Sequence, residues 1–166
     1  CSLFLGEGGA EAGLCFCDCS TGEIHLTCLR GEDVALRAVN ELGRFSPSEI
    51  LLNSEAAGDA YLSTFIDDRL GLKPDASDDS RFDYDDGRRR ILRHFGRESL
   101  GELGLEDQYP AVRALGCALS YLYATQMNGL ERLNNLDVYS DVQFMRLDVT
   151  ARRNLELLET MRSKEK

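Results

Sequence analysis

The sequence predicts an α/β domain in which a mixed five-stranded β-sheet is flanked by helices. Apolar residues alternate with polar ones over parts of the first thirty residues, which is the period of a β-strand, and they recur at helical spacing in most later segments. The resulting order of strands, helix, strand, helix, strand and helices is typical of a mixed sheet. A chain of 166 residues has room for one domain with a substantial core.

The first thirty residues predict three antiparallel strands. Residues 2–6 form a short apolar run, and residues 13–19 and 24–29 flank the polar turn "STGE" in a hairpin pattern. The middle strand is apolar on both faces, so we expect it to be covered on both sides. The third strand carries polar side chains such as His25 on one face, and we expect it to be half-exposed and outermost in the sheet.

Four elements are predicted next, between residues 32 and 84. They are a helix over residues 32–42 that Gly43 ends, a short buried strand over residues 50–52, a helix over residues 56–70, and, after a loop over residues 71–80, one more short strand over residues 81–84. The charge of the loop and its proline argue against regular structure there.

Two further helices complete the predicted domain. One follows a run of aspartates, carries arginines toward its end and stops at Gly96, an order that suits the helix dipole. Pro110 suits the first position of a long helix over residues 111–127, which is apolar on nearly every face and should be buried. We place the domain at residues 1–130. Residues 131–166 then supply two short extended pieces and a terminal helix.

The formal net charge of −10 makes the chain a poor candidate for binding nucleic acid or an anionic membrane surface on its own. No apolar run is long enough to cross a bilayer, and the first residues do not read as a signal peptide. We therefore expect a cytoplasmic protein. The six cysteines are then expected to be reduced thiols rather than disulfides.

Three of these cysteines, Cys15, Cys17 and Cys19, stand at alternate positions and raise the question of a thiolate metal site. Sulfurs around one zinc ion lie roughly 4 Å apart, whereas alternate strand residues lie ~6.6 Å apart. We therefore interpret them as small buried apolar side chains. A zinc module remains an alternative that elemental analysis would decide. His25 and His94 belong to no recognisable nucleophile motif, and we expect neither to be catalytic.

The predicted strand order is that of the ribonuclease H-like fold, whose nucleases hold two metal ions with clustered carboxylates. Here the first strand carries no carboxylate, and Asn53, Ser54 and Glu55 follow the fourth strand with one acid among them. We expect the fold without its metal site, and a metal-dependent nuclease remains the alternative reading. The glycine-rich "GEGGAEAG" lacks the lysine of a phosphate-binding loop.

A group of arginines, Arg88, Arg89, Arg90 and Arg93, lies on one predicted helix. Consecutive arginines point around a helix, so part of this group must face solvent. A solvated surface explains them, and so does a surface for docking another protein, because arginine is enriched in interfaces.

Five stretches resemble one family when they are read together: "GLCFCDCSTGEIHLT", "SPSEILL", "RHFGRESLGELGLED", "GCALSYLYATQ" and "FMRLDVTARRNLELLET". They resemble the connector domain of MutS, the bacterial mismatch-recognition ATPase, and the start of the lever helix that follows it. The likeness covers nearly the whole chain in the same order, and the last motif is quite specific. Ser46 stands where Asn is usual in the family, and Ala151 stands where Thr is common.

The resemblance implies a non-catalytic, ribonuclease H-like connector followed by the start of the core and its lever helix. Such a connector relays signals between the mismatch-reading and ATPase domains and receives MutL. Aligning on Phe95 and Gly96 puts the docking positions at Arg89 and Arg90. No catalytic residue, metal or cofactor is implied in this chain. ATP, Mg²⁺ and dimeric binding to mismatched DNA would belong to the rest of the parent protein.

Overall fold

A six-stranded mixed sheet forms the centre of the computed structural model, which describes residues 1–76, 79–126 and 128–141. The strands in this part of the chain are β1 (Ser2–Leu5), β2 (Glu11–Asp18), β3 (Glu23–Arg30), β4 (Leu51–Leu52), β5 (Asp75–Ala76) and β6 (Asn135–Val138). Their order across the sheet is β5-β4-β1-β2-β3-β6. Strand β2 runs antiparallel to its neighbours β1 and β3, and the other pairs of neighbours are parallel.

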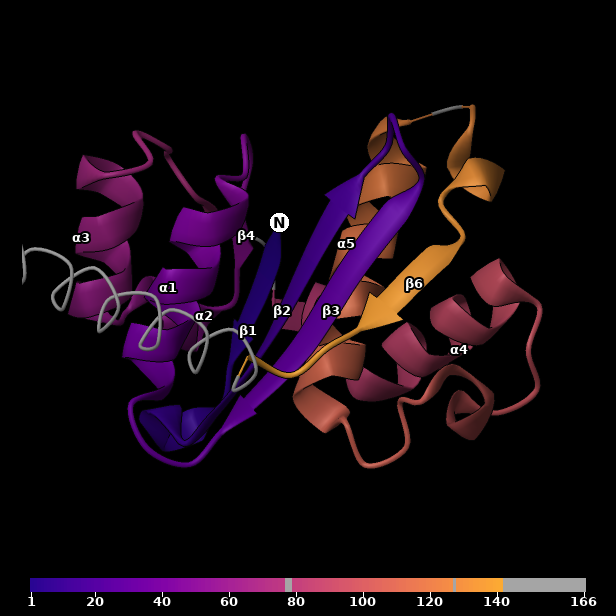
Figure 1. Cartoon of the computed structure of the whole chain (residues 1–166), viewed down its shortest axis with the longest axis horizontal. Helices are drawn as coiled ribbons and strands as arrows, with labels where there is room; N and C mark the ends of the chain where they lie inside the picture. Colours follow the sequence, from indigo (N-terminus) through magenta and orange to yellow (C-terminus); the bar gives the residue numbers. More distant parts are fainter. Residues whose placement is uncertain (77–78, 127, 142–166) are drawn as a thin grey trace, which may run out of the picture.

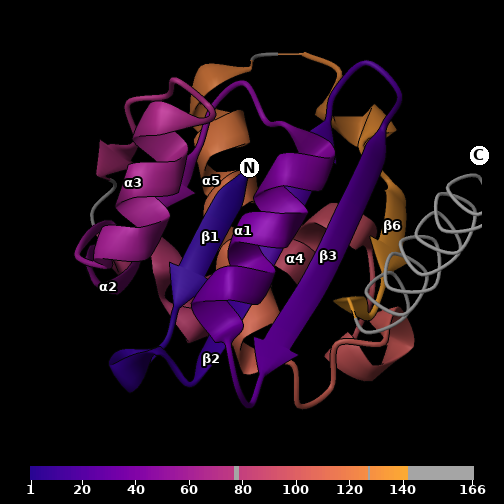
Figure 2. The same ribbon diagram turned by 60° about the vertical axis from the view of Figure 1, so that its left-hand side comes forward.

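Helices cover both faces of this sheet, as Figures 1 and 2 show. The α-helices of the described residues are α1 (Val34–Phe45), α2 (Ser54–Ala57), α3 (Ala60–Asp68), α4 (Tyr84–Phe95) and α5 (Tyr109–Thr125). Short 3₁₀ turns are η1 (Glu7–Gly9), η2 (Asp79–Phe82), η3 (Leu100–Leu103) and η4 (Leu130–Arg132). Helices α1 to α3 lie on one face, and α4 and α5 lie on the other.

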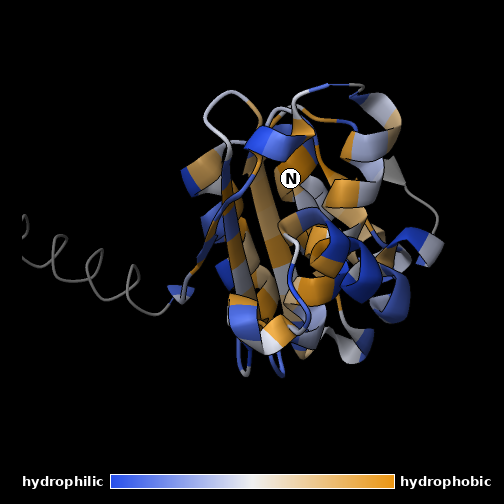
Figure 3. Ribbon diagram, turned by 90° about the vertical axis from the view of Figure 1, so that its right-hand side faces the viewer, coloured by the Kyte–Doolittle hydropathy of each residue, from blue (hydrophilic) through white to orange (hydrophobic). Residues whose placement is uncertain are grey.

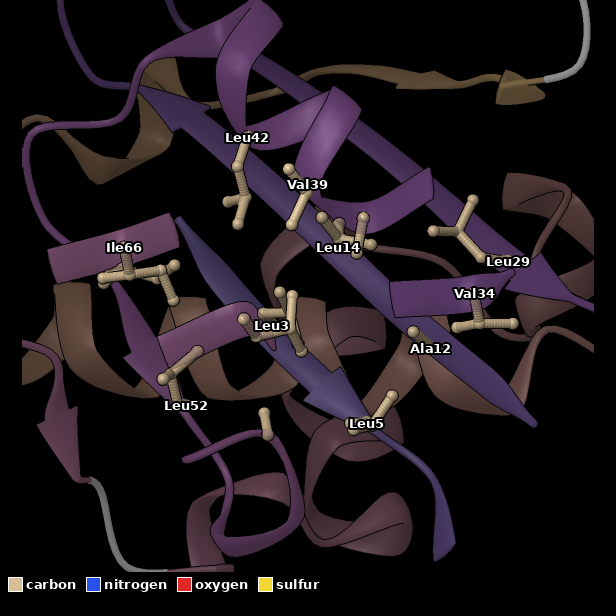
Figure 4. Packing of buried hydrophobic residues seen from close by; sticks show 14 of the residues in the cluster. Leu3, Leu5, Ala12, Leu14, Leu29, Val34, Val39, Leu42, Leu52 and Ile66 are labelled. Carbon is tan, nitrogen blue, oxygen red and sulfur yellow. The ribbon is translucent and has the colours of Figure 1, made fainter. Parts of the chain in front are cut away.

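The first core layer fills the space between the sheet and helices α1 to α3. Leu3 and Leu14 project from the sheet toward Val39 and Leu42 of α1, and Ile66 of α3 closes the side of the cluster (Figure 4). All five side chains are buried. The spacing of Val39 and Leu42 places both on one face of the helix, which is the face that packs on the sheet.

The second core layer lies between the other face of the sheet and helices α4 and α5. Ile24 and Leu26 of β3 pack there, as the apolar face of the predicted third strand requires. Helix α5 comes so close to β2 that a Cβ atom at Gly13 would lie 2.0 Å from the carbonyl oxygen of Pro110, so this contact requires glycine. Colouring by hydropathy shows apolar residues between the layers and polar ones outside (Figure 3).

The antiparallel three-strand unit, the parallel fourth strand and the buried middle strand are confirmed. The outermost position predicted for the third strand is wrong, because β6 pairs in parallel with β3 from Glu23 to Leu26. The sheet therefore has six strands in the described residues rather than five. Polar and apolar alternation reports which face of a strand is covered, and it carries no information on whether its edge is paired.

Several predicted boundaries also differ from the structure. Residues 81–84 are not a strand, because η2 ends there and α4 begins; the fifth strand is β5, inside the segment predicted as a loop. The helix predicted over residues 56–70 is two helices, with Asp59 capping the second by accepting a hydrogen bond from the Leu62 amide. Gly43 does not end α1, which runs to Phe45.

Helix α5 begins with Tyr109 and Pro110, close to the predicted start, and from Pro110 to Leu119 every residue except the half-buried Arg113 is buried. Strand β6 lies beyond residue 130, so the sheet reaches into the segment assigned to the linker. The predicted second extended piece and terminal helix, and the lever motif they carry, fall at residues 142–166, outside the described residues. No described helix combines the length and apolar character needed to span a membrane.

Candidate partner-docking surface

Helix α4 presents its arginines on a solvent-facing surface. Its start is fixed by Asp83, whose side chain accepts a hydrogen bond from the Asp86 amide at 3.0 Å. Gly96 in the left-handed conformation ends it. Gly87 and Ile91 are buried on the inner side. The exposed arginines of the helix are Arg88, Arg89 and Arg93.

The two residues predicted to dock a partner differ in their surroundings. At 100° per residue, Arg89 lies near the middle of the exposed arc of α4. Its side chain is 68% exposed and forms an ion pair with Asp86 one turn earlier. Arg90 is half-buried, and its Nη1 donates a long hydrogen bond of 3.5 Å to the carbonyl oxygen of Gly116 in α5. Arg89 thus faces solvent, while Arg90 leans on α5.

The C-terminal end of α4 is held by His94. Its Nδ1 lies 2.6 Å from the hydroxyl of Tyr123 in α5, and its Nε2 lies 2.6 Å from the carbonyl oxygen of Leu133, just before β6. Both ring nitrogens are therefore engaged in structural contacts. This geometry connects α4 to α5 and to the approach to β6, and it explains His94 without a catalytic role.

A polar cluster that sequence analysis did not find joins α1 to the residues after β6. Asp141 accepts two hydrogen bonds from Arg37, at 2.7 Å from Nε and 2.8 Å from Nη2. The hydroxyl of Tyr139 donates to the carboxylate of Glu41 at 2.7 Å. Thr27 of β3 donates to the carbonyl oxygen of Tyr139. We call Arg37, Glu41, Tyr139 and Asp141 the exit cluster.

The exit cluster is largely removed from solvent. The side chains of Arg37 and Asp141 are 14% and 3% exposed, so their ion pair is only weakly screened. The hydrogen bond to Asp141 raises the pKa of Arg37. Burial, and then the hydrogen bond to Glu41, raises the pKa of Tyr139 well above its usual range. A neutral hydroxyl at Tyr139 is therefore part of the folded cluster.

The model of one protein family, MutS domain II, matches residues 1–137. The chain belongs to the MutS domain II family. Similar proteins include the DNA mismatch repair protein MutS of Ruminiclostridium cellulolyticum, which is 31% identical over 96% of this chain, and that of Caldanaerobacter subterraneus subsp. tengcongensis, which is 34% identical over 93%. MutS 1 of Halobacterium salinarum is 34% identical over 93% of the chain. The aligned regions are 18%, 17% and 18% of the lengths of these three relatives.

Membership of this family confirms the expected resemblance to the connector domain of mismatch repair proteins. It gives no support to the alternative reading as a nuclease. After β4, where a carboxylate would be needed, Asn53 instead joins β1 to α2. Its side chain accepts a hydrogen bond from the Leu5 amide and donates one to the Leu5 carbonyl oxygen, at 3.0 and 2.8 Å. It also caps α2 at the Ala56 amide.

The connector's cysteines are closer together than strand geometry predicts. The sulfurs of Cys15 and Cys17 lie 3.6 Å apart, so the prediction that these thiols are spread is wrong. They lean toward each other along the strand and share a hydrogen bond. That bond raises the pKa of Cys15 and lowers the pKa of Cys17, and either sulfur can be its donor. Across the described residues no cluster of three metal-ligating side chains occurs.

His25 lies on the opposite side of the sheet from the second core layer. Its Nδ1 lies 3.1 Å from a carboxylate oxygen of Asp137 in β6, and its ring lies against Phe45 with centroids 5.2 Å apart. The edge position predicted for it is wrong, because β6 covers that edge. The contacts of His25 join β3 to β6, which is a structural role.

Proposed function

We propose that this chain works as a connector that docks MutL through the exposed arginines of α4. The row formed by Arg88, Arg89 and Arg93 carries this proposal, in a chain whose family is that of MutS domain II. The net charge of the chain is −10, and Asp85 and Asp86 are exposed in the first turn of α4, but all exposed side chains over the rest of this helix are arginines. Such a surface favours an acidic patch on its partner, and arginine forms strong paired contacts with carboxylates.

The exit cluster supports a second part of the proposal, that the connector transmits movement between its neighbours in the longer protein. Strand β6 and the residues after it carry the chain out of the sheet. The buried Arg37–Asp141 pair and the Tyr139–Glu41 hydrogen bond fasten this exit to α1. A displacement of the exit would therefore move α1 and the sheet as a unit. ATP binding, Mg²⁺ binding and mismatch reading are proposed to lie elsewhere in the parent.

We also propose that the fold is ribonuclease H-like and lacks the metal-binding carboxylates of the nucleases with that fold. The strand order β3-β2-β1-β4-β5, with β2 alone reversed among these strands, supports this. The residue directly after β4 supports this absence, because the side chain of Asn53 is committed to hydrogen bonds with Leu5 and Ala56. The chain would then be a structural and docking module, not an enzyme.

Capture of purified MutL by the immobilised chain tests the docking proposal. The double variant R88E/R89E should bind MutL roughly tenfold more weakly or worse, because like charges would then face the acidic patch. R69E is the matched control, since Arg69 is exposed at the end of α3, among the helices of the opposite layer. R90E separates the half-buried arginine from the exposed row. Equal capture by R88E/R89E and R69E would remove α4 from the docking site.

A further inference from the structure

Four of the six cysteines line one groove at the end of β2 where the hairpin turns. Its volume is about 850 Å³, and Cys1, Cys15, Cys17 and Cys19 all contribute to its lining. Phe45 at the end of α1 and Leu122 of α5 provide apolar walls. Cys15 is fully buried at the base, while Cys17 is partly exposed. No residue of α4 lines the groove, so it is a feature that the docking proposal does not use.

A disulfide does not suit the pair at the base of this groove. Alternate residues of a strand lie ~6.6 Å apart with parallel side chains. A disulfide holds its Cβ atoms only about 3.8 Å apart. Closing a bond between Cys15 and Cys17 would therefore bend β2, which is paired on both sides, with β1 and with β3. A link between the two sulfurs that is longer than a disulfide bond would leave the strand in place.

A metal ion bound between the two sulfurs would give a link of this length. An ion about 2.3 Å from each sulfur holds two sulfurs between roughly 3.8 Å, at a tetrahedral angle, and roughly 4.6 Å, when the three atoms are in line. The sulfurs of Cys15 and Cys17 already lie 3.6 Å apart. Small rotations of the two side chains would reach this range with the strand unchanged.

The donor set selects the class of ion. Two thiolates favour a soft ion of low coordination number, and hard ions such as Mg²⁺ prefer oxygen ligands. Structural zinc takes four ligands, but no cluster of three metal-ligating side chains occurs in the described ranges. We propose that Cys15 and Cys17 bind a soft monovalent metal ion, of the Cu(I) class, between their sulfur atoms.

Binding of the ion should depend on pH, because it releases a thiol proton. The sulfurs of Cys15 and Cys17 share a hydrogen bond, so at least one of them carries a proton before an ion binds. A bound ion takes the place of this shared proton, so at least one proton is released for each ion bound. The affinity of the chain for Cu(I) should therefore increase as the pH rises.

Anaerobic titration with Cu(I) in the presence of a coloured chelating competitor tests the site. The wild-type chain should bind one ion, and C17S should bind it at least about tenfold more weakly. C28S is the matched control, because Cys28 is a half-buried cysteine of β3 that does not line the groove, and it should bind as the wild type does. Equal affinity of C17S and C28S would overturn the proposal.

A second measurement uses the wild-type chain and so does not depend on the folding of a variant. Alkylation by a maleimide, mapped by mass spectrometry, should slow at Cys17 when one equivalent of Cu(I) is present. It should be unchanged at the exposed Cys19 and at Cys28. Protection at Cys28 equal to that at Cys17, or no protection at Cys17, would show that the ion does not sit between Cys15 and Cys17.

Discussion

Gly87 of α4 and Gly116 of α5 bring the backbones of two helices into direct contact. A Cβ atom built on Gly116 would lie 2.4 Å from the Cα of Gly87, nearer than real Cβ atoms approach. Helix α4 thus lies directly on α5, which is itself buried against the sheet. This contact sets the position of the proposed docking surface relative to the rest of the domain.

The first prediction concerns this helix contact. G116A should lower the free energy of unfolding by about 1–3 kcal/mol, because α4 must move to admit the methyl group. G43A is the matched control within α1, where the added Cβ would meet only the Phe65 ring at 3.6 Å. It should be neutral or stabilising by up to about 1 kcal/mol, as alanine favours a helix. Urea unfolding of both variants checks the prediction; equal losses would contradict it.

The second prediction concerns the exit cluster. D141N should destabilise the domain by about 3 kcal/mol, because it leaves the largely buried guanidinium of Arg37 without its charged partner. R37M should also destabilise it. In a double-mutant cycle, R37M/D141N should cost clearly less than the sum of the single changes. Simple additivity of the two losses would show that the pair does not act as a unit.

The third prediction concerns Tyr139 and pH. Its pKa is raised in the folded state, whereas an unfolded tyrosine has a pKa of about 10. Above that pH the unfolded state loses the proton first, so the contribution of Tyr139 is complete below pH 10 and falls as the pH rises further. The stability difference between the wild type and Y139F should shrink by up to roughly 1.4 kcal/mol per pH unit above pH 10. A constant difference up to pH 11 would refute the raised pKa.

The fourth prediction concerns nucleic acid and nucleotide. At physiological salt the chain should neither shift a mismatched duplex in a mobility assay nor hydrolyse ATP. Its net charge of −10 repels phosphates, and residues 1–166 contain no glycine-rich loop followed by lysine and serine or threonine. A tight, salt-resistant complex with mismatched DNA would contradict the assignment of mismatch reading to other parts of the parent.

Local patterns made much of the fold predictable. The alternation in β3, the polar turn after Asp18 and the apolar stripe of α1 each depend on neighbours in sequence. The Asp18 carboxylate accepts hydrogen bonds from the Ser20 amide and hydroxyl, as expected of an Asx turn. Helix α4 was equally predictable, because aspartates mark its start and Gly96 marks its end.

The features that sequence analysis missed depend on contacts between distant residues. Asp141 meets Arg37 across 104 residues, and β6 meets β3 across a similar separation. No local pattern marks either partner. The orientation of Arg90 toward Gly116 is of the same kind, since its place in the sequence is equivalent to that of its exposed neighbours. Strand β5 was missed because two residues are too few to show a period.

A photo-crosslinking amino acid placed at position 89 gives the most direct test of docking on α4. Position 89 lies near the middle of the exposed arc, and position 69 offers an exposed site at the end of α3 for comparison. Irradiation with purified MutL should give a crosslinked product from position 89 and little from position 69. Equal yields from both positions, or a product from position 69 alone, would contradict docking through α4.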